Sequence, residues 1–321
     1  MTTPMTTPIL SIVIVSYNTR DLTLQSLAAV YADLGDLPAE VWVVDNRSVD
    51  DSVAAIRQHY PGVKIIENPT NAGFGAANNL AMRQAHGDFI LLVNSDAFLR
   101  PGTIAVLLEH ARQHPDYGVM GPRILCPDGS RQLSCFRFTT PVRAWLENLW
   151  ISQIFKNHPT LGDYRQWPHD TDRIVDFVIG ACMLVRRAAY RAVGGFDESF
   201  FMYSEEADWQ WRMLQAGWKV GFTPAATVVH VGGASGIGEK ARINRHFFDS
   251  LDQYVRKHHG ILGLLSLRLA MAVGCSLRTI LWAVTYVTFP RRRAAAAAKT
   301  RLLSWLVVRQ TTCWSPLFKA R

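Results

Sequence analysis

The stretch LLVNSDAFLRPG, residues 91–102, decides the fold class of this chain. It begins as an apolar strand and then places Asn94, Ser95 and Asp96 before a Pro-Gly turn. Asp and Asn are poor strand formers, and a carboxylate at the end of a buried strand needs water, a helix cap or a cation. The stretch therefore predicts a strand that stops at a polar edge.

Further runs rich in Val and Ile precede this strand, and segments of helical composition separate them. Continuous apolar strands that alternate with helices are typical of a parallel sheet. We therefore expect an α/β fold with a doubly wound, mostly parallel sheet and helices on both faces. The predicted strands cover residues 10–15, 41–44, 63–66 and 89–93, and the helices between them include residues 21–31 and 51–59.

Each predicted strand of this half ends in polar residues. These ends are residues 16–18, 45–52, 68–75 and 94–96. In an open parallel sheet, ligands bind beyond the carboxyl ends of the strands, so we expect these loops to converge on one crevice.

Composition bounds the function. The chain has 321 residues, 49% of them hydrophobic, which suffices for one large α/β domain and an appendage. Its net charge of +8 comes from the C-terminal part, where basic residues alternate with long apolar runs instead of lining a polar groove, so we expect no nucleic-acid partner. Five cysteines without CxxC spacing argue against disulfides and zinc, and fit a reducing compartment.

Six motifs follow one another between residues 11 and 233: SIVIVSYN, VVDNRSVDDS, NAGFGAANN, LLVNSDAFLRPG, GGFDESFFMYSEEADWQWR and VVHVGG. Together and in this order they resemble the family 2 glycosyltransferases of the GT-A fold. The resemblance is to bacterial members that are rhamnosyltransferase-like or galactofuranosyltransferase-like.

The resemblance implies an inverting glycosyltransferase. It would transfer a sugar, with rhamnose favoured, from a nucleotide-diphosphate sugar to a hydroxyl of a cell-envelope glycan or a polyprenyl-linked acceptor. Two alternatives stay open: a galactofuranosyltransferase or other hexosyltransferase of the same fold, and a catalytically silent nucleotide-sugar-binding membrane scaffold.

A divalent metal, Mn²⁺ or Mg²⁺, is implied by the same resemblance. Asp96 stands where the family has the last residue of its metal-binding Asp-x-Asp, with Asn94 in place of the first Asp, and His230 stands at the position of a ligating histidine. Carboxylate and imidazole suit these cations, with phosphate and water completing the coordination. Without the other motifs, Asp96 would be read as a turn or cap residue.

The donor would be held by the polar strand ends. Asp45 corresponds to the acid that contacts the base or ribose in the family, although it could also cap the following helix. Glycines in the NAGFGAANN motif permit close backbone approach to a ligand. The predicted donor-site residues are Ser16, Tyr17, Asn18, Asp45, Asn46, Asn71, Gly73, Asn78, Asn79, Asn94, Ser95 and Gly180.

The general base is expected in the SEEADW motif. The resemblance assigns it to Glu206, where the family usually has Asp, with Glu205 or Asp208 positioning the acceptor. Like charges close together raise the pKa of a carboxylate, which makes a better base at neutral pH. The simpler reading is a solvated helix N-terminus, where acids interact favourably with the helix dipole.

Four regions are predicted. Residues 1–8 are a disordered N-terminus unlike a secretory signal, so the catalytic part is expected in the cytoplasm. Residues 9–125 form the nucleotide-sugar-binding half of the GT-A domain, and residues 126–240 its acceptor-binding, catalytic half. Residues 241–321 form amphipathic or hydrophobic helices.

The last region would associate peripherally with the inner face of the cell membrane, because its basic residues suit anionic lipid. Packing of these helices on the domain or on a partner is the alternative. The sequence leaves the oligomeric state open.

Overall fold

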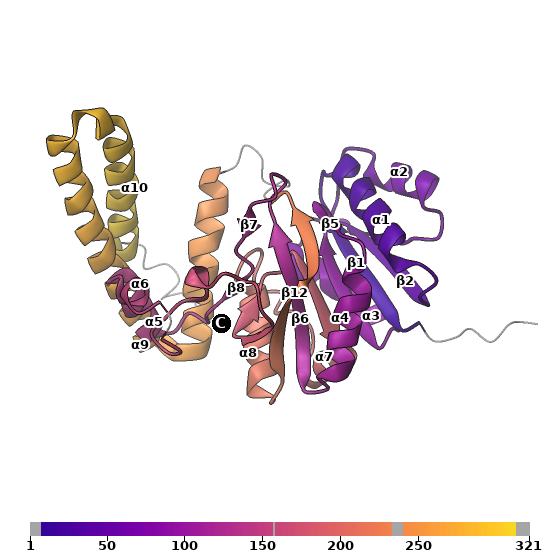
Figure 1. Cartoon of the computed structure of the whole chain (residues 1–321). Helices are drawn as coiled ribbons and strands as arrows, with labels where there is room; N and C mark the ends of the chain where they lie inside the picture. The colour runs from indigo at the N-terminus through magenta and orange to yellow at the C-terminus, as the bar shows by residue number, and fades with distance from the viewer. Residues whose placement is uncertain (1–7, 157, 233–239, 313–321) are drawn as a thin grey trace, which may run out of the picture. The chain divides into compact units, whose positions relative to one another are not determined.

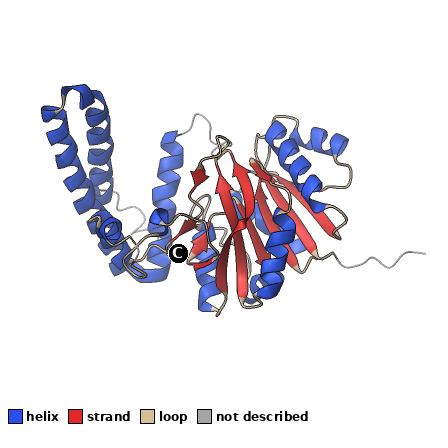
Figure 2. Ribbon diagram, in the orientation of Figure 1, coloured by secondary structure: helices blue, strands red, loops and turns tan. Residues whose placement is uncertain are grey.

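The first four strands form the parallel half of the central sheet (Figures 1 and 2). They are β1 (Leu10–Ser16), β2 (Ala39–Asp45), β3 (Lys64–Glu67) and β4 (Phe89–Asn94), in the order β3-β2-β1-β4. The register sets Ser16 beside Asp45 and Val15 beside Asn94, so the polar ends of three strands lie level. This half confirms the predicted parallel α/β core.

The second half of the sheet is mixed. β11 (Cys182–Arg186) runs antiparallel between β4 and β6 (Tyr117–Leu125), and β12 (Lys219–His230) pairs in parallel with β6. β5 (Ala97–Leu99) lies antiparallel to the end of β12. The short strands β7 (Arg131–Gln132) and β9 (Arg173–Val175) pair with β6 and β12, and β8 (Cys135–Phe136) and β10 (Phe177–Val178) form a separate two-stranded sheet.

Helices cover both faces of this sheet (Figure 2). Leu10, Ile12 and Ile14 of β1 point into a core shared with α1 and α4, while the intervening side chains face α3 on the other side. Such alternation is expected of a strand buried on both faces. The helices of this part are α1 (Arg20–Leu34), α2 (Ser52–His59), α3 (Phe74–Gln84), α4 (Thr103–Gln113), α7 (Arg187–Val193) and α8 (Glu205–Gln215).

These features come from a computed structural model that describes residues 8–156, 158–232 and 240–312. The chain divides into two compact units. Unit 1 comprises Met1–Arg137 and Pro168–Ser250 and holds the sheet, and unit 2 comprises Phe138–Trp167 and Leu251–Arg321. Of the predicted disordered N-terminus, only Pro8 is among the described residues.

Unit 2 is helical. Its elements are α5 (Pro141–Asn148), α6 (Ile151–Ile154), the 3-10 helix η1 (Tyr164–Gln166), the part of α9 (Lys240–Thr288) after Ser250, the 3-10 helix η3 (Pro290–Arg292) and α10 (Arg293–Thr312). Gly260 breaks α9 because its φ of 68° and ψ of −171° are not helical. The predicted C-terminal helices are therefore present.

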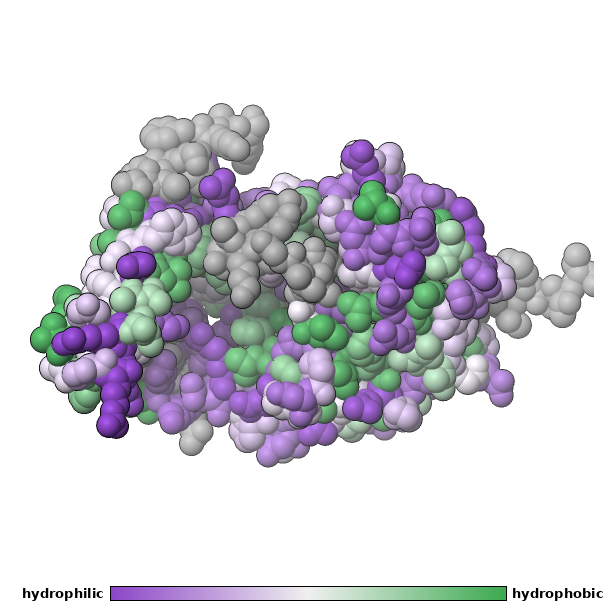
Figure 3. Space-filling model, turned by 90° about the horizontal axis from the view of Figure 1, so that it is seen from above, coloured by the Kyte–Doolittle hydropathy of each residue, from purple (hydrophilic) through white to green (hydrophobic). Residues whose placement is uncertain are grey.

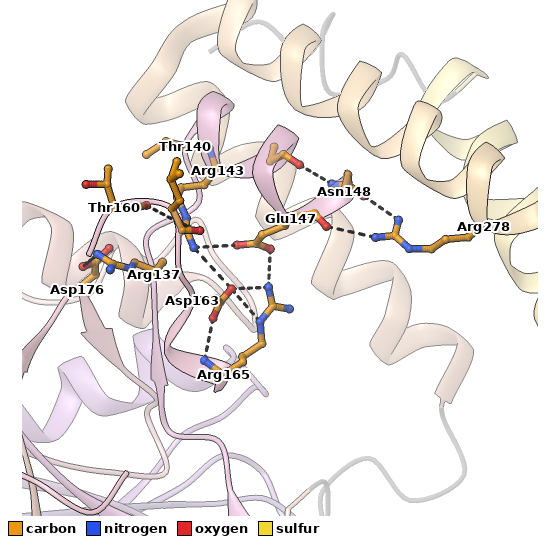
Figure 4. A network of polar contacts seen from close by, with 12 residues as sticks. Arg137, Thr140, Arg143, Glu147, Asn148, Thr160, Asp163, Arg165, Asp176 and Arg278 are labelled. Carbon is orange, nitrogen blue, oxygen red and sulfur yellow. Dashed lines mark hydrogen bonds and ion pairs between the residues drawn. The ribbon is translucent and has the colours of Figure 1, made fainter. Parts of the chain in front are cut away.

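A network of charged side chains fixes the 138–167 segment of unit 2 (Figure 4). The buried Asp163 carboxylate accepts hydrogen bonds from Arg165 at 2.6 Å and lies 3.7 Å from Arg143. Glu147 pairs with Arg165 at 2.9 Å. Burial raises the pKa of Glu147, and the two arginines lower it only in part. Because two cations face two carboxylates, the network is balanced and acts as a structural clamp.

Candidate active site

Asp96 and His230 meet at one corner of unit 1. β5 follows Asp96 directly and pairs with the end of β12, so that His230 lies opposite Ala97. The Asp96 carboxylate is 3.2 Å from Nε2 of His230, and both side chains are buried. The other carboxylate oxygen of Asp96 accepts a hydrogen bond from the Gly232 amide at 3.0 Å. The structure thus brings the two predicted metal ligands together.

Asn94 and Gln132 complete this corner. The amide nitrogen of Asn94 lies 3.3 Å from Nε2 of His230, and Gln132 Oε1 lies 3.1 Å from Nδ1. A ring that donates from Nδ1 to Gln132 leaves a lone pair on Nε2, which can accept a hydrogen bond from Asn94 or bind a cation shared with Asp96. Gln132 carried no sequence signal because it lies outside every motif.

The corner supplies few protein ligands. The described residues hold no group of three or more His, Cys, Asp or Glu that could bind a metal ion. The oxygen of the Asn94 amide, however, is buried without a hydrogen-bond partner. One carboxylate, one imidazole and one amide oxygen fit Mn²⁺ or Mg²⁺ when phosphate and water supply the remaining ligands.

Asp45 has one occupied and one open carboxylate oxygen. Oδ2 accepts a hydrogen bond from the Ser48 amide at 2.9 Å, whereas Oδ1 is buried and has no partner in the described part of the chain. At the neighbouring strand end, Ser16 bonds Thr23 at 2.9 Å, and Thr19 donates to Ser95 at 2.9 Å. These hydroxyl contacts tie the end of β1 to the end of β4.

Asn46 and Asn71 hold the loop that follows β3. Asn46 Nδ2 donates to Asn71 Oδ1 at 2.8 Å, and Asn46 Oδ1 accepts from Asn68 and from the Ala72 amide. Both ends of the buried Asn46 amide are therefore used within the protein. The contacts indicate that Asn46 shapes the loop.

The remaining predicted donor-site residues differ in their surroundings. Tyr17 is half-buried, and Asn18 is exposed and bridges to residues 48 and 49. Asn78 donates to the Phe74 carbonyl one turn earlier in α3. Asn79 is buried, donates to the Phe196 carbonyl and to Glu198, and accepts from the Phe196 amide. Asn79 thus joins α3 to the start of the GGFDESFF segment, which favours a structural role.

Gly73 allows a close approach between the NAGFG motif and the segment before α8. Its φ is +87°, and a Cβ there would lie 2.1 Å from the Phe201 carbonyl oxygen. The same oxygen accepts a hydrogen bond from the Phe74 amide at 3.2 Å. Two residues on, a Cβ at Gly75 would lie 3.7 Å from Cβ of Glu205. The starts of α3 and α8 therefore pack against each other.

Glu205 and Glu206 begin α8 and carry open carboxylate oxygens. Glu205 is 4% exposed and Glu206 is half-buried, and Oε2 of each is buried without a hydrogen-bond partner among the residues that the structure describes. Burial, together with the charge of Glu206, raises the pKa of Glu205 well above its ordinary value. Burial also raises the pKa of Glu206, and the backbone amides of Glu206 and Gly180 offset part of that effect.

Gly180 connects the acidic pair to the Asp96 corner. The backbone amide of Gly180 faces the Glu206 carboxyl. The carbonyl of the next residue, Ala181, accepts a hydrogen bond from the backbone amide of Asn94 at 2.9 Å. A Cβ at Gly180 would lie 3.0 Å from the Phe74 ring. Glu206, Gly180 and Asn94 are thus linked by consecutive contacts across the edge of the sheet.

Asp208 has a different environment from the two glutamates. It is fully buried, and its carboxylate accepts a hydrogen bond from Arg212 at 2.9 Å, one turn along α8. Arg212 also donates to the carbonyls of Val193 and Gly195 at 2.7 Å. This ion pair fastens α8 to the end of α7 and favours a structural role for Asp208.

Buried side-chain oxygens without a hydrogen-bond partner distinguish some of these predicted site residues from the others. Among the described residues of unit 1, four buried side-chain oxygens lack a hydrogen-bond partner, and they belong to Asp45, Asn94, Glu205 and Glu206. Buried polar groups are normally paired, so orphaned acceptors at one edge of a sheet need hydroxyl donors or a cation from outside the protein. The edge therefore fits a ligand rich in hydroxyl groups and able to bring a cation.

The fold and these residues define a sugar-transferring α/β enzyme, and comparison with known proteins gives its family. Residues 11–194 match Glycosyl transferase family 2. The chain is 32% identical over 236 residues to N-acetylglucosaminyl-diphospho-decaprenol L-rhamnosyltransferase of Mycobacterium tuberculosis, covering 70% of this chain and 76% of that protein. It is 28% identical over 228 residues to rhamnosyltransferase WbbL of Escherichia coli, covering 68% and 82%.

The chain belongs to glycosyl transferase family 2 and is a glycosyltransferase. Mannosyltransferase PcManGT from Pyrobaculum calidifontis, solved with GDP-Man and Mn²⁺, aligns over 96% of this chain and 88% of its own with a TM-score of 0.53 and 17% identity. That alignment concerns the fold alone, and it confirms the predicted GT-A architecture.

Replacing Gly73 by Ala should cost more stability than the same change at Gly102. Both glycines have φ near +86°, but a Cβ at Gly102 meets nothing within 4 Å, whereas one at Gly73 meets the Phe201 carbonyl. We expect Gly102→Ala to lower the unfolding free energy by about 1–2 kcal/mol and Gly73→Ala by about 3 kcal/mol or more, measured by urea denaturation. Equal losses would show that the contact with Phe201 adds no constraint.

Proposed function

We propose that this enzyme is an inverting rhamnosyltransferase that uses a nucleotide-diphosphate rhamnose and a lipid-linked glycan acceptor. The observation that carries the proposal is the set of four orphaned buried oxygens on Asp45, Asn94, Glu205 and Glu206. A nucleotide sugar and an acceptor glycan bring the hydroxyl donors that these oxygens lack. The relatives in Mycobacterium tuberculosis and Escherichia coli are named as rhamnosyltransferases, which supports this sugar.

The donor would lie along the ends of β1, β2 and β4. Asp45 would accept a hydrogen bond from the base or ribose through its open Oδ1, with the loop at Ser16, Tyr17 and Asn18 beneath. The diphosphate would lie near the starting turn of α3, between these strand ends and the Asp96 corner. This arrangement leaves the sugar between the Asp96 corner and Glu206.

Asp96, His230 and the amide oxygen of Asn94 would hold the divalent cation, Mn²⁺ or Mg²⁺. When bound, such a cation stabilises the negative charge that develops on the departing diphosphate. The Gly232 amide and Gln132 contact Asp96 and His230, and this second layer of contacts fixes the orientation of both side chains.

Glu206 would serve as the general base. Oε2 of Glu206 accepts the proton of the acceptor hydroxyl while the hydroxyl oxygen attacks the anomeric carbon. The bond between that carbon and the diphosphate breaks on the opposite side, with inversion. Burial raises the pKa of Glu206 toward working pH, which strengthens it as a base. The more buried Glu205 keeps its proton to a higher pH than an ordinary Glu, and it would bind a second hydroxyl of the acceptor.

Unit 2 would bind the inner face of an anionic membrane. Of the exposed large hydrophobic side chains among the described residues, seventeen lie in unit 2 and six in the larger unit 1. Leu262, Leu269, Ile280, Val284 and Val287 of α9 recur at helical spacing and are 55–77% exposed. The helix over Arg245–Thr288 is long and apolar enough to cross a membrane, and it is the one helix among the described residues of which this is true.

Charge supports an interfacial position over a span. After Asp252 the sequence contains twelve Lys and Arg and no Asp or Glu. Arg291, Arg292 and Arg293 are exposed at the turn between α9 and α10, and the guanidinium of Arg293 lies over the ring of Tyr286. Hydrophilic and hydrophobic residues lie side by side on the surface of the C-terminal helices (Figure 3). Carrying three arginines through a bilayer is costly, whereas an anionic surface attracts each of them.

Asp96→Ala should abolish metal-dependent donor binding. We expect calorimetry with a panel of nucleotide-rhamnose, nucleotide-galactofuranose and nucleotide-glucose donors to show tightest binding of a rhamnose donor in the presence of Mn²⁺. The variant should lose at least about tenfold in affinity, because one carboxylate ligand is removed. Asp128→Ala, in an exposed turn, is the control. Unchanged donor affinity with and without Mn²⁺ would refute the metal assignment.

Glu206→Gln should retain donor binding and lose transfer. Removing a general base typically costs about 10²–10⁴ in rate, so kcat should fall by that factor while donor KM changes little. In the wild type, kcat should rise with pH, with a midpoint above the ordinary value for Glu, since the base acts only when ionised. The control is Glu109→Gln, since Glu109 is exposed on the outer face of α4. Near-normal transfer by Glu206→Gln would place the base elsewhere.

Replacing Arg291, Arg292 and Arg293 together by Ala should weaken binding to anionic vesicles. At about 1 kcal/mol for each basic residue, the loss amounts to about 100-fold in co-sedimentation with phosphatidylglycerol vesicles. A triple replacement of the exposed Arg57, Arg112 and Arg191 in unit 1 matches the charge change and should have little effect. If the wild type binds neither anionic nor zwitterionic vesicles, unit 2 is not a membrane-binding region.

A further inference from the structure

The segment that precedes the proposed base is held in a strained conformation. Tyr203 and Ser204 have φ of +69° and +63°, in the left-handed region that side-chain-bearing residues rarely adopt. Such residues persist where surrounding contacts over-determine them, and they gather at ligand sites. Here one contact is the hydrogen bond from the Phe74 amide to the Phe201 carbonyl, and another is from Ser250 Oγ to the Met202 carbonyl at 2.7 Å.

The hydrogen bond from Ser250 brings residues 246–250 of α9 beside residues 201–204. Two pairs of aromatic rings pack together there. Tyr203 packs against Phe247 with ring centroids 5.7 Å apart and planes at 72°. Phe201 packs against His246 at 5.0 Å. All of these residues belong to unit 1. The strained backbone thus serves to place Tyr203 against Phe247.

Tyr203 also lies close to the acidic pair. Burial raises the pKa of its phenol, and the charges of Glu205 and Glu206 raise it further. Phe247, in contact with Tyr203, is 45% exposed although it is a large apolar side chain. The Phe247 ring also meets the Phe248 ring, with centroids 5.3 Å apart, and still keeps nearly half of its surface open to solvent beside Tyr203.

We propose that Tyr203 and Phe247 form an aromatic platform that binds a pyranose ring of the acceptor and presents its hydroxyl to Glu206. This proposal rests on the function proposed above. The face of an aromatic ring is electron-rich and attracts the C–H groups on the apolar face of a sugar ring. The edge-to-face pair offers one ring face from Phe247 and a phenol hydroxyl from Tyr203, which suits a ring with an apolar face and a polar rim.

The occupant is a sugar ring and not the lipid chain of the acceptor. Tyr203 lies next to two carboxyl groups with orphaned oxygens, and these would be left unpaired against a hydrocarbon. A sugar pairs them through its hydroxyl groups while it covers the exposed ring of Phe247.

Direct acceptor binding tests the platform. Saturation-transfer NMR would measure binding of the methyl and the octyl pyranosides of N-acetylglucosamine to the full-length enzyme without donor. We expect Phe247→Ala to weaken both about tenfold, Phe247→Trp to restore binding, and Phe247→Leu to leave it weak. Equal binding by the Leu and Trp variants would overturn aromatic stacking, and a loss confined to the octyl pyranoside would show that the surface binds the alkyl chain.

Steady-state kinetics separates this proposal from the proposed function. With the rhamnose donor, Phe247→Ala should raise acceptor KM about tenfold while donor KM stays within about twofold. The matched control is Tyr31→Ala. Tyr31 is an exposed aromatic residue of α1 whose ring stacks on that of Tyr60 with centroids 5.4 Å apart, and its replacement should change neither acceptor KM nor donor KM. A wild type that transfers no sugar refutes the proposed function, whereas normal acceptor KM and pyranoside binding in Phe247→Ala refute the platform alone.

Discussion

The approach of Gly73 to the Phe201 carbonyl is the contact on which the site depends. No side chain can occupy position 73, since its Cβ would overlap that oxygen. The contact joins two motifs that are far apart in the sequence and packs the start of α3 on the start of α8. Glu205 is then buried against Gly75 by backbone packing, and its Oε2 has no hydrogen-bond partner among the described residues. Packing of this kind leaves carboxylate oxygens unpaired, as the proposed substrate-binding role requires.

Hydrogen-bond saturation distinguishes scaffold from site in unit 1. Asn46, Asn79 and the Asp208–Arg212 pair use their polar atoms within the protein, and each fastens one segment to another. Asp45 and Glu206, in contrast, each keep a buried oxygen without a partner. Unpaired buried acceptors cost folding free energy, about 1–3 kcal/mol each, so their persistence at one edge of the sheet indicates a function that uses them.

The sequence predicted the fold well because strand hydrophobicity and polar strand ends are local signals. Pairing partners are not local: nothing in the Asn79 side chain itself indicates that Phe196 and Glu198 take up its amide, nor that Arg212 takes up Asp208. Strand direction is equally hidden, because an apolar run such as β11 looks the same parallel or antiparallel. The segment Phe138–Trp167 contacts the C-terminal helices of its unit through side-chain hydrogen bonds from Trp145 to Ser266 and from Arg278 to Asn148, which no periodicity shows.

The division of charge gives the chain an electrostatic polarity. Of its 34 Lys and Arg, 12 follow Asp252, and all 26 Asp and Glu lie at or before Asp252, so residues 1–252 carry a net charge of −4. The overall charge of +8 therefore describes neither part. An anionic surface attracts the C-terminal helices and repels the acidic remainder, with an effect that fades within about 8 Å at physiological salt. A membrane-bound state of the C-terminal helices, as proposed above, would therefore add no attraction between that surface and residues 1–252.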